Sequence, residues 1–348
     1  MMNENNFASL AHSCIQFIIV NWNSSQSTLY LVNQILPHLD PSENICIIDN
    51  GSDDEQVEKL KIGLPYHREL SDYDTEGEQA AEAFKGVKVL LKCCKHNRGY
   101  GAGINTGIEA LGEQGARSWY WVLNSDIRFL HPEAILSIRN QLSNLPTTQS
   151  IVSPPVIDNK GMVKTGFQEL KSGHYTSKSI VFDGYKASGE MSKSDHIWGC
   201  SMILGASLVK AIGRFDEQFF LYEEETDYCI RAQKEGFPLY YLFVEPLDHS
   251  SREENRGKEK PQHHNGTKRQ SKTYVLYFKT RNSFLIYRKH HKGKWLFWPV
   301  RFSYIMLVMY RLIRKGYCNL NLISVLFMGL KDGLLGRFGE YRRNQFGL

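Results

Sequence analysis

Apolar runs that end in polar loops recur along the first 130 residues, with amphipathic stretches after some of them. The runs predicted to form buried strands are Ile15–Val20, Ile45–Ile48, Val87–Leu91 and Trp119–Leu123. Two stretches with the apolar spacing of helices are Thr28–Leu39 and Gly103–Leu111. Repeated strand-loop-helix units predict an α/β fold with a mostly parallel sheet, in which ligands bind at the carboxyl ends of the strands.

The pattern changes after residue 150. Short strands and turns are predicted for residues 151–205, a helix near Glu224 and a strand at Tyr240–Val244. Two polar stretches interrupt the pattern: residues 66–86 are expected to form a surface insertion, and residues 250–272 a flexible loop or lid. We therefore expect one large domain in residues 1–249, that loop, and a helical C-terminal extension in residues 273–348.

Positive charge is concentrated in the C-terminal extension. The chain has a net charge of +5, but residues 260–331 contain 15 Lys and Arg and no Asp or Glu. Residues 1–259 consequently carry a net charge of −11. A basic tail on an acidic body indicates an anionic partner, either nucleic acid or a membrane surface.

The apolar content of the extension favours the membrane. Trp295–Tyr310 and Leu320–Leu330 are strongly apolar, and both are shorter than the roughly 20 residues of a membrane span. Aromatic-rich helices with flanking Arg lie in the membrane interface. We expect peripheral attachment to an anionic membrane surface and no nucleic-acid partner. A helical hairpin packed on the large domain is an alternative, and the two can hold together.

The cysteines and the N-terminus indicate a reducing compartment. Seven cysteines without a Cys-x-x-Cys pair indicate neither a disulfide framework nor a zinc ribbon. The first 13 residues have no basic segment, and the apolar run that follows is short, so it is predicted as a strand and not as a secretion signal. We expect a cytoplasmic protein on the inner face of the plasma membrane.

A glycine-rich segment, Asn97–Gly107, precedes a predicted helix. Its glycines would let backbone N–H groups approach phosphate oxygens, and Arg98 can add a charge-assisted hydrogen bond to a diphosphate. The segment also suggests an alternative, an NAD(P)-dependent oxidoreductase, because its glycines approximate a dinucleotide fingerprint and Asp126 follows about 20 residues later. Against this alternative, the glycine spacing has one extra residue and the unit comes third in the chain.

Carboxylates occur at three further places. Asp49–Ser52 follows the second strand and suits hydrogen bonding to a base or ribose, although it is also common turn chemistry. Asp126 closes the fourth strand, where it can hold a divalent cation or cap a turn. Glu223–Glu225 concentrate like charge at a helix start, where a general base with a raised pKa can arise. His249 is either a metal ligand or a core histidine.

Taken in order, these segments resemble the family 2 glycosyltransferases, in particular the bacterial rhamnosyltransferase-like branch. The matching pieces cover roughly residues 15–290 and are Val20–Asn23, Asp49–Ser52, Asn97–Gly107, Leu123–Asp126, Trp198–Cys200, Phe215–Asp227, His249 and Arg281–Asn282. Each piece is modest alone, and the ordered set is specific. The resemblance implies a GT-A fold with a donor half at about 15–130 and an acceptor half at about 150–249.

The resemblance also implies which residues bind the donor. Trp22 would stack on the nucleobase, Asp49 would hydrogen-bond its imide edge, and Arg98 would contact the diphosphate or ribose. The full implied set is Asn21, Trp22, Asn23, Asp49, Asn50, Ser52, Asn97, Arg98, Gly101, Asn105, Asn124 and Asp126.

For the remaining roles, the resemblance implies that Asp126 and His249 bind Mg²⁺ or Mn²⁺ and that Glu225 is the catalytic base beside Glu224. The acceptor side would be lined by Trp198, Gly199 and Asp227. Asp227 also has the spacing of an intrahelical pair with Arg231.

Two positions depart from the family pattern. Asn124 replaces the first acid of the Asp-x-Asp motif, which leaves fewer metal ligands, and Glu225 stands where the family has Asp, so either Glu224 or Glu225 reaches the acceptor. The expected function is an inverting glycosyltransferase. It would move rhamnose or a hexose from a dTDP or UDP donor to a glycan or lipid-linked acceptor in cell-surface polysaccharide synthesis.

Overall fold

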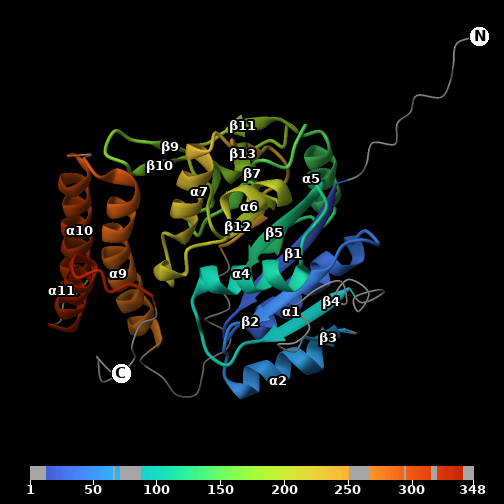
Figure 1. Cartoon of the computed structure of the whole chain (residues 1–348), viewed down its shortest axis with the longest axis horizontal. Coiled ribbons are helices and arrows are strands. Elements are labelled where there is room, and N and C mark those ends of the chain that lie inside the picture. The colour runs from blue at the N-terminus through green and yellow to red at the C-terminus, as the bar shows by residue number, and fades with distance from the viewer. Residues whose placement is uncertain are drawn as a thin grey trace, which may run out of the picture.

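The computed structural model describes residues 13–65, 67–70, 88–250, 267–293, 295–314 and 320–339 (Figure 1). Most of the predicted insertion at 66–86 lies outside the described residues, as do residues 251–266 of the predicted loop.

A nine-stranded sheet forms the centre of the molecule. Its strands, from one edge to the other, are β11 (Met191–Lys193), β13 (Leu239–Leu242), β7 (Ile151–Ser153), β12 (Ser201–Gly205), β5 (Ser118–Asn124), β1 (Cys14–Asn21), β2 (Ile45–Asp49), β4 (Val89–Cys93) and β3 (His67–Glu69). Only β11 and β12 run antiparallel to their neighbours. The predicted mostly parallel sheet is confirmed.

A second sheet lies beside the first. Its strands, in order, are β10 (Tyr175–Val181), β9 (Met162–Glu169), β8 (Val156–Ile157), β14 (Leu247–Asp248) and β6 (Arg128–Phe129). Strand β14 pairs antiparallel with β6, so Asp248 lies opposite Arg128. This pairing brings the chain after β14 to the loop after β5.

Helices cover both faces of the large sheet. They are α1 (Ser25–Ile35), α2 (Asp54–Gly63), α4 (Tyr100–Leu111), α5 (Ala134–Ser143), α6 (Ala206–Ile212) and α7 (Glu224–Lys234). Side chains of α1 and α5 pack with one face of the sheet, and those of α4, α6 and α7 with the other. The central strands are buried on both faces: in β1, Phe17 and Ile19 point to the first core, and Ile18 and Val20 to the second.

The C-terminal extension consists of α9 (Thr267–Ile286) with a π-helical turn at Tyr287–His291, then α10 (Phe297–Arg314) and α11 (Leu320–Leu334). Figure 1 shows these helices, coloured orange to red, grouped at one end of the molecule. Helix α11 packs along α9, where Val325 and Leu326 are buried. None of the described helices is both long enough and apolar enough to cross a membrane.

The predicted loop at 250–272 is too long, because α9 already begins at Thr267. Residues 267–272 contain neither Gly nor Pro and include Lys, Arg and Gln, which favour helix. The predicted strands differ from the observed ones by at most two residues at either end, whereas the helix predicted at Gly103 begins three residues earlier, at Tyr100.

Candidate active site

Polar residues meet where three parallel strands end. The pairing of β1 with β2 places Asn21 opposite Asp49, and the pairing of β1 with β5 places Val20 opposite Asn124. The Ser24 and Ser125 hydroxyl oxygens are 2.8 Å apart and join the loops after β1 and β5. The loop with Trp22 therefore lies next to the loop with Asp126.

Asp126 and His249 form the predicted pair of metal ligands. The His249 Nε2 atom is 3.3 Å from Asp126 Oδ1 and 3.5 Å from Asn124 Nδ2. One carboxylate and one imidazole suit Mn²⁺ and are also compatible with Mg²⁺ in a site completed by phosphate oxygens and water. Among the described residues, no group of three or more His, Cys, Asp or Glu side chains is placed to hold a metal. The chain thus offers two ligands at this point.

Trp198 and Gly199 connect that pair to the glutamates of α7. The Trp198 ring meets the His249 ring edge to face, with centroids 6.0 Å apart. On the other side, a β-carbon built on Gly199 would lie 3.2 Å from Glu225 Cβ. The carbonyl of Gly199 accepts a hydrogen bond from the Tyr100 hydroxyl at 3.2 Å.

Tyr100 lies within the electrostatic range of both ends of the site. Its partly buried phenol has a raised pKa, chiefly because of burial, with further increases from nearby groups that include Glu224, Asp126 and Glu225. Since all three carboxylates act on one phenol, the metal-ligand pair and the glutamates belong to one region of the protein.

The glutamate loop, residues 219–223, leads into α7. Positive φ angles occur at Phe220 (61°), Tyr222 (67°) and Glu223 (74°), and each such angle costs a non-glycine residue about 1–3 kcal/mol. Asn282 of α9 stabilises this backbone, because its amide nitrogen donates to the carbonyls of Phe219, Leu221 and Tyr222 at 2.7–2.9 Å.

The three glutamates ionise differently. Burial, reinforced by Glu225, raises the pKa of Glu224 well above its usual range, and its buried Oε2 atom has no hydrogen-bond partner among the described residues. Burial and the Glu223 charge raise the pKa of Glu225 to about 7. Burial opposes ionisation of Glu223 as well, but Arg301 and Lys279 leave the pKa of Glu223 below its usual value. Glu225, which is more exposed than Glu224, is the better placed proton acceptor near neutral pH.

Several residues predicted to bind the donor are buried and hydrogen-bonded within the protein itself. Asn21 donates to Asp49 and Ser52, and both residues of the Asn21–Asp49 pair are fully buried. Asn50 bonds the backbone of residues 98 and 99. Asn21, Asp49 and Asn50 thus hold the turns under the site, and their contact with a donor stays a prediction. Ser52, which is only partly buried, also bonds Asp49.

Three glycines of the glycine-rich segment pack closely against the protein interior, and the predicted phosphate contact stays a prediction. Gly103 lies against Val20 and Gly107 against Ile18, and Gly101 faces Phe215. The first N–H of α4 is already bonded to the Phe220 carbonyl at 2.7 Å. The first N–H of α4 is therefore not available to a phosphate, and the structure gives the oxidoreductase alternative no support.

Asn105 and Asp227 are likewise engaged within the protein. The Asn105 side chain exchanges hydrogen bonds with the Phe215 backbone, so it holds a loop and not a donor. Asp227 is fully buried and contacts Arg231, Lys289 and His290. The predicted pair with Arg231 is present, and no surface of Asp227 is left for an acceptor.

Other predicted residues lie at the surface. Trp22 is 49% exposed, as a ring that stacks on a base requires. Its neighbour Asn23 is also exposed and accepts from the Asp53 N–H. Arg98 forms an exposed ion pair with Glu217 at 2.9 Å, and Asn97 accepts from the Gly99 N–H.

Sequence reasoning missed three residues of the site: Tyr100, Lys279 and Arg301. Tyr100 lies within the glycine-rich segment Asn97–Gly107, in which no role was predicted for it. Lys279 and Arg301 belong to the basic extension, whose charge indicates an anionic membrane partner in the sequence. A signal was present in the matched segment Arg281–Asn282, which already linked the extension to the large domain.

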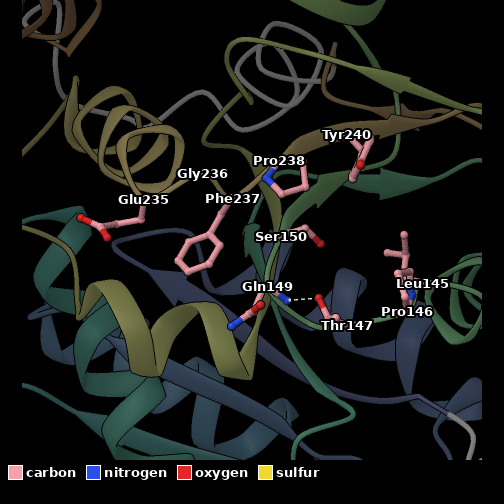
Figure 2. Close-up of a pocket in the computed structure, with 10 residues that line it drawn as sticks. All are labelled: Leu145, Pro146, Thr147, Gln149, Ser150, Glu235, Gly236, Phe237, Pro238 and Tyr240. Atoms are coloured by element: carbon pink, nitrogen blue, oxygen red, sulfur yellow. Dashed lines mark hydrogen bonds between the residues drawn. The ribbon is translucent and has the colours of Figure 1, made fainter.

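Figure 2 shows a cavity of about 260 Å³ elsewhere on the molecule. Its lining includes Thr147, Ser150 and Pro238, which precede or begin β7 and β13. Strands β7 and β13 run in the same direction as β5. The cavity therefore lies at the amino ends of these parallel strands, whereas Asn124 lies at the carboxyl end of β5. It is not part of the candidate site.

Comparisons with known proteins agree with this geometry. No family model matches the chain. The chain is 27% identical over 143 residues to the low-salt glycan biosynthesis hexosyltransferase Agl10 of Haloferax volcanii, covering 41% of this chain and 46% of the relative. It is 26% identical over 203 residues to the N-acetylglucosaminyl-diphospho-decaprenol L-rhamnosyltransferase of Mycobacterium tuberculosis, covering 52% of this chain and 66% of the relative. The chain thus spans about half the length of the first relative and just under two thirds of the second.

A solved structure resembles almost the whole chain. The mannosyltransferase PcManGT of Pyrobaculum calidifontis, in complex with GDP-Man and Mn²⁺, aligns with a TM-score of 0.51 and 10% identity, over 94% of this chain and 88% of that one. At this identity the likeness establishes the fold. The mixed α/β fold with a large, mostly parallel sheet is therefore that of a GT-A glycosyltransferase, and the relatives named here are glycosyltransferases as well.

Proposed function

We propose that this chain is an inverting glycosyltransferase of the family 2 type that transfers rhamnose or a hexose from a nucleoside diphosphate. The acceptor is a glycan or a lipid-linked sugar, and the product serves cell-surface polysaccharide synthesis. Support for the class of donor and acceptor comes from the two curated relatives, a hexosyltransferase and a rhamnosyltransferase acting on a diphospho-decaprenol.

One observation carries the proposal: the Asp126–His249 pair and Glu225 are joined through Trp198 and Gly199 into one site. Glycosyl transfer needs a place for a diphosphate and a base beside it. An acid with a pKa of about 7 and an oxygen-nitrogen ligand pair meet those two needs.

In the proposed reaction, Trp22 stacks on the nucleobase and Glu225 takes the proton of the acceptor hydroxyl. The acceptor oxygen attacks the anomeric carbon as the bond from that carbon to the diphosphate oxygen breaks, and the electron pair leaves with the nucleoside diphosphate. A single displacement inverts the anomeric configuration. A divalent cation, when bound by Asp126 and His249, would neutralise charge on the leaving diphosphate.

Thermal melting with nucleotides tests the proposal. We expect UDP or dTDP to raise the melting temperature in the presence of Mn²⁺, because a ligand that binds only the folded state stabilises it. Asp126→Asn should remove the Mn²⁺-dependent part of that shift. Hydrolysis of dTDP-rhamnose or UDP-glucose by the wild type is the activity readout. A shift with NADH and none with UDP, dTDP or GDP would contradict the proposal.

We further propose that the protein is cytoplasmic and attached to the inner face of the plasma membrane through its extension. On α10, Phe302, Met306 and Tyr310 are spaced four residues apart, so they share one helix face, and they are 64%, 52% and 56% exposed. Exposed basic residues of the extension include Lys292, Lys331 and Arg337. Apolar side chains with nearby positive charge suit an anionic lipid surface.

A further inference from the structure

The basic extension contacts the glutamate loop directly. Arg301 of α10 donates to Glu223 Oε1 at 3.0 Å and to the carbonyl of Lys279, in α9, at 2.8 Å. It also donates to the Ser283 hydroxyl. One guanidinium therefore connects α10, α9 and the residue before α7. The side chains of Arg301 and Glu223 are only 13% and 18% exposed, so solvent screens this pair little.

The backbone at Glu223 adopts the left-handed conformation, which non-glycine residues disfavour. Glu223 has a φ of 74° and no side-chain cap for α7, because its carboxylate points to Arg301 instead. The next two residues are the glutamates of the site. Whatever orients Glu223 therefore also orients the first turn of α7 and the Glu225 side chain.

Several charged and titratable groups surround Glu223. The cationic ones come from the extension, Arg301 and Lys279, and lower the pKa of Glu223 against the effect of burial. His174, Tyr175 and His196, from the strand region that includes β10, also interact electrostatically with Glu223. Burial lowers the pKa of His196 to about 4, so His196 is neutral near pH 7 and Arg301 makes the direct ion pair.

We propose that Arg301 is a positioning residue for sugar transfer: by binding Glu223 and the α9 backbone together, it fixes the loop from which Glu225 reaches the acceptor. The inference rests on the proposed transferase function. Arg301 acts through Glu223 and does not touch the reacting atoms. The ionised Glu223 is also the negative charge that, after burial, most raises the pKa of Glu225.

A role in stability alone predicts a different outcome from a role in positioning. A purely structural Arg301 would change the melting temperature and leave the turnover of the folded enzyme unchanged. A positioning residue changes kcat, because a displacement of the base by about 1 Å costs on the order of 100-fold in rate. The donor KM should stay constant, since Asp126 and His249 lie on other elements.

The experiment compares R301Q, R301K and E223Q with R314Q, a control on the exposed part of the same helix. Hydrolysis of dTDP-rhamnose and UDP-glucose is measured with Mn²⁺ and without membranes. We expect R301Q to lose roughly 10-fold to 100-fold in kcat with an unchanged donor KM. R301K should recover part of the loss, and R314Q should match the wild type.

E223Q gives an independent readout. Removing the Glu223 charge lowers the pKa of Glu225, so the acid limb of the kcat/KM profile should move below its wild-type position near pH 7. Wild-type kcat in folded R301Q, or an unmoved limb in E223Q, would overturn the inference while the proposed function stands. If R301Q does not fold, R301K and E223Q test the inference instead. Wild-type kcat and an unmoved acid limb in both of these variants would overturn the inference. A wild type that turns over neither donor would overturn the proposed function, and this inference with it.

Discussion

Gly199 stands so close to Glu225 that a β-carbon added to it would lie 3.2 Å from Glu225 Cβ and 3.3 Å from Glu225 Cγ. Such distances are shorter than ordinary van der Waals contact, so one of the two residues would have to move. The glycine is therefore needed for the close approach of the segment after Trp198 to the first turn of α7.

Gly199→Ala should displace Glu225 and lower kcat by roughly 10-fold to 100-fold. The donor KM should change little, because the metal-ligand pair lies on the far side of Trp198. Gly115→Ala is the matched control, since its β-carbon would meet only the Ser118 hydroxyl at 3.7 Å. Equal steady-state constants for the two variants would contradict the close packing at Gly199.

Glu225→Gln should reduce kcat by on the order of 10²–10⁴, because it removes the general base. Glu224→Gln should cost less, since burial and Glu225 raise the pKa of Glu224 and so already disfavour its charged form. Donor binding, measured by melting with UDP or dTDP and Mn²⁺, should persist in both variants. A larger loss of kcat in Glu224→Gln than in Glu225→Gln would indicate that Glu224 is the general base.

From the low pKa of Asp227 we expect the folded protein to lose stability at acid pH. Burial alone would raise the pKa of Asp227, but hydrogen bonds from His290 and Lys289 lower it to about 2. Because the pKa of Asp227 is lower in the folded chain than in the unfolded chain, where it is near 3.8, ionised Asp227 stabilises the fold at a pH above 3.8. This stabilisation disappears as the pH falls through about 2. The shift corresponds to about 2 kcal/mol.

Melting curves of the wild type and Asp227→Asn between pH 7 and pH 2 check this prediction. The variant should be less stable by about 2 kcal/mol at pH 7, because it removes the ionised partner of Arg231 and Lys289. The difference between the two proteins should narrow below pH 4. A constant difference across the whole range would show that Asp227 does not titrate as described.

Phe302→Ser combined with Met306→Ser should weaken binding to vesicles that contain anionic lipid. Each side chain is more than half exposed, and burying an apolar side chain contributes about 1.5–3 kcal/mol. Ser303→Ala, at an exposed position between them, is the control. Sedimentation with phosphatidylglycerol vesicles and with phosphatidylcholine vesicles measures the effect. Unchanged vesicle binding by the double variant would show that this face of α10 is not the membrane contact.

The order of apolar runs and polar loops was enough to predict the parallel sheet, because strands such as β1 and β5 are buried on both faces and contain almost only apolar residues. An ordered set of motifs was enough to select Asp126, His249 and Glu225 as candidate site residues. Their closeness follows from the pairing of β14 with β6 and from Gly199, and neither contact shows in residue spacing.

Two features could not be predicted from spacing. The glycines of α4 resemble a phosphate cradle in the sequence, but the Phe220 carbonyl covers that helix end in the folded chain. The sequence also does not tell which cation meets which anion, so Arg301 was counted with the lipid-binding charges. Its ion pair with Glu223 joins residues 78 positions apart.

The contribution of α9 and α10 to the glutamate loop has a consequence for synthesis. A nascent chain that has left the ribosome only as far as residue 250 already contains Asp126, His249 and Glu225. The carbonyls of Phe219, Leu221 and Tyr222 still lack Asn282, and Glu223 lacks Arg301. Such a chain can form its sheet, whereas its glutamate loop reaches its final backbone only after the last helices emerge.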